Sequence, residues 1–384
     1  MLTNVTTEIA LGATMLDGTP TWTDVSAYVR NTTVNRGRPT ITGRFAAGTA
    51  TLTLDNRDGR FNPENTAGAY YPDLQIGIPV RIYEDSEPIF YGSARAWPPA
   101  YPKTQDSFVT VPLVDGFYNL NLEDLGGDSY PAQSSTSRLT AVLDAISWPA
   151  GLRDLDTGLA AIQAVDIAQP SDGGDQPALL HLLDVVEAEA GTLFMSRDGK
   201  VTFRNRIALS GISPAVSFAD TELSGLTVAY DDDYLWNEFR VAREDGAQVI
   251  YVDTTSVAAH GRRALVRDVM PMSNDAEVLN LVEWLAAVFG VQRSRIEGLK
   301  LVMHDTAAHL DDVLGLELRD LINVTHVPPG GDTINVDCVI EGIRHVMVPG
   351  KWTTYLSVVP AAETETQDYW ILDTSELEVS TRLA

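Results

Sequence analysis

The side chains most suited to holding a cation lie between residues 55 and 59. Asp55, Asn56 and Asp58 carry oxygen ligands, and Gly59 follows them directly. A calcium loop of the EF-hand type requires a ligand where Arg57 stands and a bidentate glutamate at its closing position, and the sequence supplies neither. Short Asx side chains followed by glycine also form tight turns between strands. We therefore predict a turn here, with a calcium site as the less favoured interpretation.

Histidines and the single cysteine raise the question of a metal site or a nucleophile. His304 and His309 are five residues apart, which does not place them on one helix face, and the chain has no HExxH motif. His326 and His345 stand singly in strand-like runs. Cys338 lies in the alternating segment NVDCVIEG and excludes an intrachain disulfide. We expect structural histidines and a buried cysteine.

Hydrolytic chemistry also lacks a recognisable motif. No GxSxG nucleophile elbow occurs, since the segments SGIS and SGLT do not have that order. The chain has 53 acidic residues, so a carboxylate pair at glycosidase spacing arises by chance. The run 231–233 predicts a solvated turn, with a cation site less favoured. We expect no enzymatic activity, no cofactor and no metal.

Composition limits the classes of partner. The 384 residues suffice for two to four domains, and the net charge is −26. Tight binding to a nucleic-acid backbone depends on lysine and arginine. An acidic chain of this kind is therefore better suited to let DNA pass than to bind it tightly. No stretch approaches the ~20 apolar residues of a membrane-spanning helix, and the N-terminus shows no secretion signal.

The elements that must position these residues are mainly strands. Residues 1–120 contain the alternating runs TATLTL, PVRIY, PIFYGSARAW and FVTVPLVDGFYNL, which predict a first β-barrel-like domain. Its loop WPPAYPK has too many prolines for a central strand and should cross an edge or the end of a barrel. Residues 221–265 and 300–362 show the same alternation of apolar and polar residues and predict a second β-barrel-like domain.

Helical patterns separate these β regions. Residues 121–220 predict an α/β domain with one helix starting near Ser137 and another that starts at Pro177 and is closed by Gly191. The segment TLFMSRDGKVTFRNR then predicts a hairpin with Asp198 and Gly199 in its turn. Residues 266–299 predict a helical insertion capped by Asn274, and residues 363–384 a C-terminal extension whose residues 369–372 can dock on a neighbour. The fold class is mixed, β-rich α+β.

Seven segments of the chain form a recognisable set: WTDVSAYVRNTTVNRGR, LDNRDGRFNPEN, YYP, GIPVRI, DGKVTFRNR, SVAAHGRR and VIEGIRHVMVPGKWTTYLSVVPA. Together they resemble the minor tail proteins of tailed phages, specifically the tail-tip or baseplate hub. His260 stands where the family has an aromatic residue. The likeness spans nearly the whole chain. It is strongest to the hub proteins of phages with long noncontractile tails, and these proteins are related to the baseplate hub of contractile phages. The motif positions that we expect to be structural signatures are Asp55, Asn56, Asp58, Gly59, Arg60, Tyr70, Tyr71, Pro72, Gly261, Arg262, Arg263, Gly342, Pro349, Gly350 and Trp352.

The resemblance implies a structural virion protein at the distal tail tip, assembled in the cytoplasm of the bacterial host. It implies a homotrimer whose two tail-tube-type barrels per chain cap the sixfold tail tube. The implied partners are a distal tail or tail-tube protein, the tape measure protein, and a tail fibre or receptor-binding protein. Phage DNA would pass through the ring without tight binding.

Two other functional classes stay open on sequence alone. A glycan-binding module would stack sugar rings on exposed aromatic side chains, for which Trp97, Tyr101 and Trp352 are the candidates. A tail-associated peptidoglycan hydrolase is less favoured, because hub-like segments take up the whole length of the chain.

Overall fold

The first β region is an antiparallel arrangement of strands in residues 5–114. The computed structural model describes residues 5–38, 44–169, 176–229, 235–290, 295–303 and 310–361, with two short strands at 369–370 and 382–383. Buried and exposed positions alternate along β4 and β8, as expected for strands with one face on a core. The elements are β1 (Val5–Ile9), β2 (Thr23–Asp24), the 3-10 helix η1 (Ser26–Tyr28), β3 (Val29–Gly37), β4 (Thr49–Asp55), β5 (Pro79–Glu84), β6 (Glu87–Ala94), β7 (Pro99–Lys103) and β8 (Asp106–Val114).

The proline-rich loop lies where the sequence predicts it. Its strand β7 pairs with β8 and with no other described strand. Proline cannot donate to a ladder, so an edge position leaves no hydrogen bond unmade.

An α/β piece follows, covered by three helices. Ser134 caps α2 by accepting from the amide of Ser137, close to the expected start. Its elements are α1 (Gly116–Leu122), β9 (Ser129–Tyr130), β10 (Gln133–Ser134), α2 (Ser135–Ala145), the 3-10 helix η2 (Ala150–Leu152), β11 (Arg153–Leu155), β12 (Ala161–Ile162), β13 (Val165–Asp166), α3 (Ala178–Glu189), β14 (Thr192–Met195) and β15 (Val201–Arg204).

The end of α3 differs from the expectation by one residue. Pro177 does start the helix, but Ala190, with φ of 56°, is the left-handed residue that closes it. Gly191 serves a different purpose, because a Cβ atom there would lie 2.6 Å from the carbonyl oxygen of Arg204. The hairpin of β14 and β15 that follows is confirmed, with Asp198 and Gly199 in its turn.

The remaining strands divide among three sheets. β18, β19 and β20 form a three-stranded sheet of their own, β16, β17 and β21–β24 join the large sheet, and β25 pairs with β26. Asn274 caps α5 by accepting from the amides of Ala276 and Glu277, as predicted. The elements are β16 (Val216–Phe218), β17 (Gly225–Ala229), β18 (Glu238–Arg243), β19 (Val249–Val252), α4 (Thr254–His260), β20 (Ala264–Met270), α5 (Asp275–Phe289), β21 (Arg295–Val302), α6 (Leu310–Gly315), β22 (Leu321–His326), β23 (Ile334–Val348), β24 (Lys351–Pro360), β25 (Tyr369–Trp370) and β26 (Arg382–Leu383).

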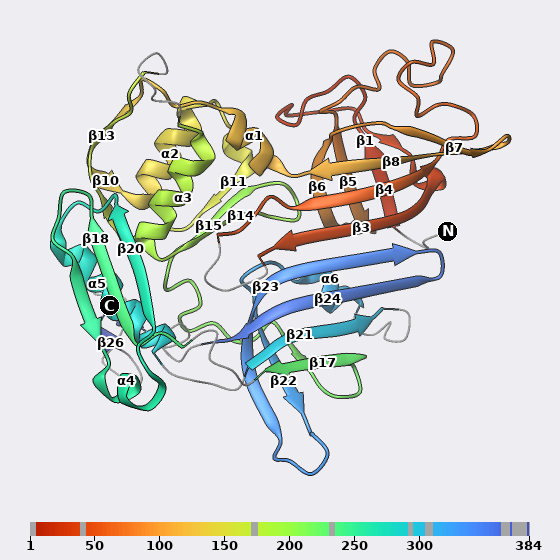
Figure 1. Cartoon of the computed structure of the whole chain (residues 1–384). Helices are drawn as coiled ribbons and strands as arrows, with labels where there is room; N and C mark the ends of the chain where they lie inside the picture. Colours follow the sequence, from red (N-terminus) through yellow and green to blue (C-terminus); the bar gives the residue numbers. More distant parts are fainter. Residues whose placement is uncertain are drawn as a thin grey trace.

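One ladder joins the two β regions. The main path of the fourteen-stranded sheet runs β17-β21-β24-β23-β3-β4-β8-β6-β5-β1-β2, so β3 of the first region pairs directly with β23 of the second. Figure 1 shows the first region, in red and orange, above the blue strands of the second, with the α/β piece and the β18–β20 sheet beside them. The two regions are therefore continuous through backbone hydrogen bonds.

The β-rich α+β class predicted from the sequence is confirmed. One cluster of buried apolar side chains extends through both β regions, the α/β piece and the β18–β20 sheet. The domain boundaries predicted from the sequence stay predictions. Among the helices in the described ranges, none is long and apolar enough to cross a membrane.

Candidate functional site: the junction of the β regions

The junction begins with two glycines that face each other across the β3–β23 ladder. Gly37 is paired with Gly342, next to an irregularity in the β23–β24 register between Ile340 and Gly342. Gly37 has φ of +105°, and a Cβ atom there would lie 2.2 Å from the carbonyl oxygen of Glu341. Only glycine fits this position without moving the backbone. The family-motif residue Gly342 thus lies at the contact between the two β regions.

Glu341 is the buried anion of this junction. Its residue exposure is 2%, and its two carboxylate oxygens lie 2.6 Å from Nε of Arg38 and 2.6 Å from a guanidinium nitrogen of Arg319. Backbone bonds hold the same arginines, from Arg38 N to Glu341 O at 2.8 Å and from Arg319 N to Ile340 O at 2.8 Å. A buried carboxylate with two charged partners is stable only while all of them stay in place.

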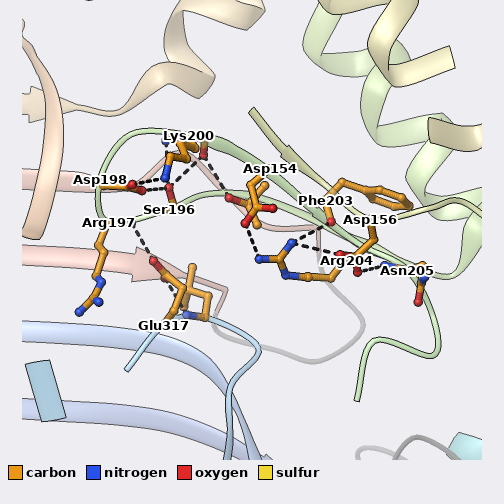
Figure 2. Close-up of polar contacts among 12 residues, drawn as sticks. Asp154, Asp156, Ser196, Arg197, Asp198, Lys200, Phe203, Arg204, Asn205 and Glu317 are labelled. Atoms are coloured by element: carbon orange, nitrogen blue, oxygen red, sulfur yellow. Dashed lines mark hydrogen bonds and ion pairs between the residues drawn. The ribbon is translucent and has the colours of Figure 1, made fainter. Parts of the chain in front are cut away.

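A second ion pair ties in the α/β piece. The buried guanidinium of Arg36 donates to Glu317 and, over 2.9 Å, to the carbonyl oxygen of Met195 on β14. The other carboxylate oxygen of Glu317 accepts from the amide of Arg197, in the hairpin turn, at 2.8 Å (Figure 2). Arg197 in turn lies 3.0 Å from Glu87 of β6. Glu317 therefore links both β regions to the hairpin between them.

The base of that hairpin carries its own charged contacts. Figure 2 shows Arg204 between two carboxylates, 2.6 Å from Asp154 and 3.2 Å from Asp156. The side-chain hydrogen bond from Arg204 holds the pKa of Asp154 below its usual value. Arg204 of β15 thus contacts two carboxylates, and its pair with Asp154 of β11 links the two strands through their side chains.

His345 is a buried neutral imidazole on the second-region side of the junction. Its Nδ1 lies 2.9 Å from Oγ1 of Thr354 and accepts from Nε1 of Trp352 at 3.3 Å. Burial first, and the charge of Arg36 second, lower the pKa of His345 to about 3. The expectation of a structural histidine is confirmed here. His326 pairs with Asp220, and His304 and His309 lie outside the described residues.

The turn between β23 and β24 is formed by Pro349 and Gly350, and Trp352 follows it. Val348 pairs with Lys351, so the two motif residues form the whole loop, and Gly350 has φ of +77°. Trp352 is only 8% exposed. The expectation that Trp352 is an exposed platform for sugar is therefore wrong, because its ring is packed against His345.

The segment 55–60 is a turn, as predicted. Asn56 is buried, its side chain accepts from the amide of Phe61 at 2.8 Å, and Gly59 has φ of +70°. Asp55 bonds Nε of Arg57 at 2.9 Å, and that hydrogen bond is the main cause of its lowered pKa. The oxygens suggested as calcium ligands thus already have partners within the chain.

The neighbouring aromatic residues form a packed layer over this turn. Arg60, held by Asp58 at 2.6 Å, lies 4.0 Å above the ring of Tyr28 and 5.6 Å above that of Tyr70. Tyr70 is buried. Tyr71, which precedes Pro72 through a cis peptide bond, is 47% exposed.

The aromatic residues suggested for sugar stacking differ in their exposure to solvent. Trp97 is 6% exposed, stacks on Phe61 with an interplanar angle of 4°, and donates from Nε1 to the carbonyl oxygen of Gln75. The expectation that Trp97 is exposed is wrong, because this ring closes the core beneath the turn. Tyr101 is 65% exposed on the edge strand β7. A single exposed ring remains of the three candidates.

The GRR motif is held by a residue that sequence reasoning missed. The side chain of Asn237 donates to the carbonyl oxygen of Gly261 at 2.7 Å and accepts from the amide of Arg263 at 2.7 Å. The next residue, Glu238, is buried and lies 3.0 Å from Nε of Arg262. Asn237 and Glu238 stand in the segment WNEFRVAR, where two polar residues lead into an apolar strand pattern, and that position was the available signal.

No cluster of three or more potential metal ligands occurs in the described residues. Cys338 is fully buried as predicted, and burial raises the pKa of its thiol to about 12. Burial also raises the pKa of Asp115 to about 7, but its oxygens accept from the amides of Gly48 and Phe117, so it acts as a helix cap. The run 231–233 lies outside the described residues.

Comparison with known structures identifies the fold. The chain is similar to the tail protein from Neisseria meningitidis MC58, with a TM-score of 0.62 and 13% identity over 93% of this chain and 96% of that one. It is also similar to the prophage MuSo2 tail protein from Shewanella oneidensis, with a TM-score of 0.59 and 14% identity over 93% and 98% of the two chains.

A third similar structure comes from a secretion system. The E. coli c3393 protein, described as a type VI secretion component with structural similarity to the T4 bacteriophage tail proteins gp27 and gp5, gives a TM-score of 0.50 and 11% identity over 89% and 76%. No protein-family model and no curated protein matches the chain. The fold is that of phage tail proteins, which confirms at the level of structure the resemblance seen in the motifs.

Proposed function

We propose that this protein is a structural component of a phage tail, the hub of the tail tip or baseplate. The observation that carries the proposal is the likeness to two phage tail proteins over nearly the full length of all three chains. This likeness supports a structural role, and the proposal is for a structural part of the tail and not for an enzyme.

The finer proposal is a homotrimeric ring that caps the distal tail tube. Each chain contributes two β regions that are held as one body by the β3–β23 ladder and by the buried charges of Glu341 and Glu317. A ring wall needs such stiffness, because neighbouring β regions must keep a constant angle to match the symmetry of the tube. The ring would hold a tail-tube protein, the tape measure protein and a fibre or receptor-binding protein.

Charge supports a channel for DNA over a DNA-binding surface. The chain carries 53 acidic and 27 basic residues, and many of the described arginines pair with carboxylates of the same chain. Phosphate binding would have to break those pairs and displace their partners. The acidic channel wall would therefore repel a passing DNA duplex and would offer its phosphates no binding site.

Light scattering on the purified protein tests this proposal. A trimer of 41.7 kDa chains has a mass of about 125 kDa, and the proposal expects this mass alone or after addition of the tail-tube partner. A chain that stays monomeric with its partner present would refute the ring. A peptidoglycan zymogram tests the absence of catalysis, and a lysis band from purified protein would contradict it.

A further inference from the structure

A cavity of about 140 Å³ lies where the α/β piece meets the β18–β20 sheet and its helix α5. Figure 1 shows this contact, with α3 close to β20. The apolar walls of the cavity come from both sides, from Leu183 and Val186 on α3 and from Leu281, Leu285 and Phe289 on α5. A molecule in the cavity would therefore contact two parts of the fold at once.

Polar contacts join the two sides of this cavity. Arg267 of β20 lies 2.6 Å from Glu187 of α3, and the amide of Ser273 donates to the carbonyl oxygen of Ala161 at 2.9 Å. The cavity is thus a gap within a formed contact and not a space between separate parts.

Two lining residues show that this contact is incompletely packed. The hydroxyl of Thr192 and the indole nitrogen of Trp284 are buried without a hydrogen-bond partner among the described residues. Protein interiors are normally close-packed, and buried donors normally find an acceptor. A cavity of this size beside two unpaired donors indicates a contact that a bound group completes.

The size and the lining of the cavity favour an aromatic ring. Apolar cavities of about 150 Å³ hold a benzene molecule. The rings of Phe45, Trp284 and Phe289 belong to the lining, and the last two already lie edge to face with centroids 6.4 Å apart. Aromatic rings pack well against one another in such edge-to-face or offset arrangements.

The charges on the lining favour an uncharged ligand. Each arginine of the lining has a carboxylate partner in the chain: Arg44 and Arg267 pair with Glu187, and Arg38 and Arg319 pair with Glu341. An anionic ligand would have to compete with these carboxylates for the same guanidinium groups.

We propose that this cavity binds one uncharged aromatic ring of about the size of toluene. Toluene has the chemistry of a phenylalanine side chain, so the ring can belong to a free small molecule or to a partner protein. Because the ring would contact both α3 and α5, its binding would hold the β18–β20 sheet more firmly against the α/β piece. The proposal concerns a single chain and does not depend on the trimeric ring.

Ligand titrations of the full-length chain test this proposal. Toluene probes the ring alone, and N-acetyl-phenylalanine amide probes the same ring attached to a peptide backbone. Saturation-transfer NMR gives the Kd of each, and thermal unfolding reports whether the ligand stabilises the fold. Val186→Phe fills the cavity from a wall position that is 4% exposed. Leu180→Phe is the matched control, because Leu180 lies on the same helix but is 44% exposed.

We expect toluene to bind with a Kd below about 1 mM and to raise the melting temperature of the native chain. Val186→Phe should weaken binding at least about tenfold, because the larger side chain occupies the space of the ring, and Leu180→Phe should change it less than about twofold. Leu285→Trp fills the cavity from α5 and keeps the test decisive if Val186→Phe fails to fold.

The two probes also distinguish the sources of the ring. Tighter binding of the amide than of toluene would support the site and identify a partner's side chain as the occupant, whereas the reverse order would support the site for a free small molecule. Absence of saturable binding of both probes to the native chain would overturn the proposal. Binding that a folded cavity-filling variant leaves unchanged would also overturn it.

Discussion

Gly37 of β3 lies opposite Gly342 of β23, at a point where the backbones of the two β regions leave no room for a side chain on Gly37. The carbonyl of Glu341 occupies the space that a side chain on Gly37 would need. The same residue presents its carboxylate to Arg38 and Arg319. Close backbone contact and buried charge thus coincide at one point of the sheet.

Replacing Gly37 by alanine should destabilise the whole protein. The added Cβ atom meets a backbone oxygen at 2.2 Å, and φ of +105° is strained for any L side chain. We expect the free energy of unfolding, measured with denaturant, to fall by at least about 3 kcal/mol. Gly77→Ala is the matched control, since Gly77 also has positive φ but no atom within 4 Å of the added carbon. Equal losses in both variants would show that the close approach does not matter.

Glu341→Gln should lower the free energy of unfolding by more than such a small change of side chain suggests. The neutral amide keeps the shape but leaves two arginines, each with a side chain 15% exposed or less, without their shared anion. We expect a loss of about 2–4 kcal/mol in denaturant unfolding. Asp58→Asn, which breaks the more exposed pair with Arg60, should cost less than about 1 kcal/mol. Similar losses for the two variants would contradict a buried charge network at the junction.

His345 should make the fold less stable in mild acid. Its pKa is lowered in the folded state to about 3 from 6.5, so the unfolded chain takes up the proton first as the pH falls. The stability contribution is therefore complete above pH 6.5 and decreases toward pH 3. Between pH 7 and pH 5 the loss is about 2 kcal/mol, at 1.36 kcal/mol per pKa unit.

The check for His345 is a comparison of pH slopes. His345→Gln should lose about 2 kcal/mol less than the native chain when denaturant unfolding is repeated at pH 7 and pH 5. His181, whose pKa is lowered to about 4, has the same direction and remains in both proteins. Identical slopes for the two proteins would mean that folding does not lower the pKa of His345.

Cys338 should be inert in the native protein. Its side chain is fully buried, and burial raises the pKa of the thiol to about 12, so little thiolate exists at pH 8. A disulfide reagent that releases a chromophore should report no reaction in native buffer and one thiol per chain in denaturant. Rapid reaction of the native chain would place Cys338 at an accessible position.

Alanine substitutions of Trp97 and Tyr101 should distinguish a role in core packing from a role in glycan binding. Trp97→Ala removes a ring stacked on Phe61 and should cost about 3–5 kcal/mol of stability. Tyr101→Ala, at an exposed edge, should change stability by less than about 0.5 kcal/mol. Saturable binding of cell-wall polysaccharide that Tyr101→Ala abolishes would favour the glycan-binding alternative over a purely structural role.

Local features of the chain were readable from its sequence. The Asn56–Gly59 turn, the β14–β15 hairpin with Asp198 and Gly199, and the Asn274 cap of α5 are all present as predicted. Each depends on hydrogen bonds between residues only a few positions apart, and the side chains that make them stand in the same short segment. The alternation of β4 and β8 belongs to the same class, because strand burial has a period of two.

The junction and the cavity were decided by the tertiary structure alone. Arg36 and Glu317 are 281 residues apart, and Arg38 and Glu341 are 303 apart, so no local pattern pairs them among many acids and arginines. The prediction that Trp97 is exposed was wrong for the same reason, because a tryptophan in a proline-rich loop is buried or exposed according to which distant residues pack over it. Short-range propensity sets each element, whereas the pairing of distant elements depends on which surfaces the whole chain can bury together.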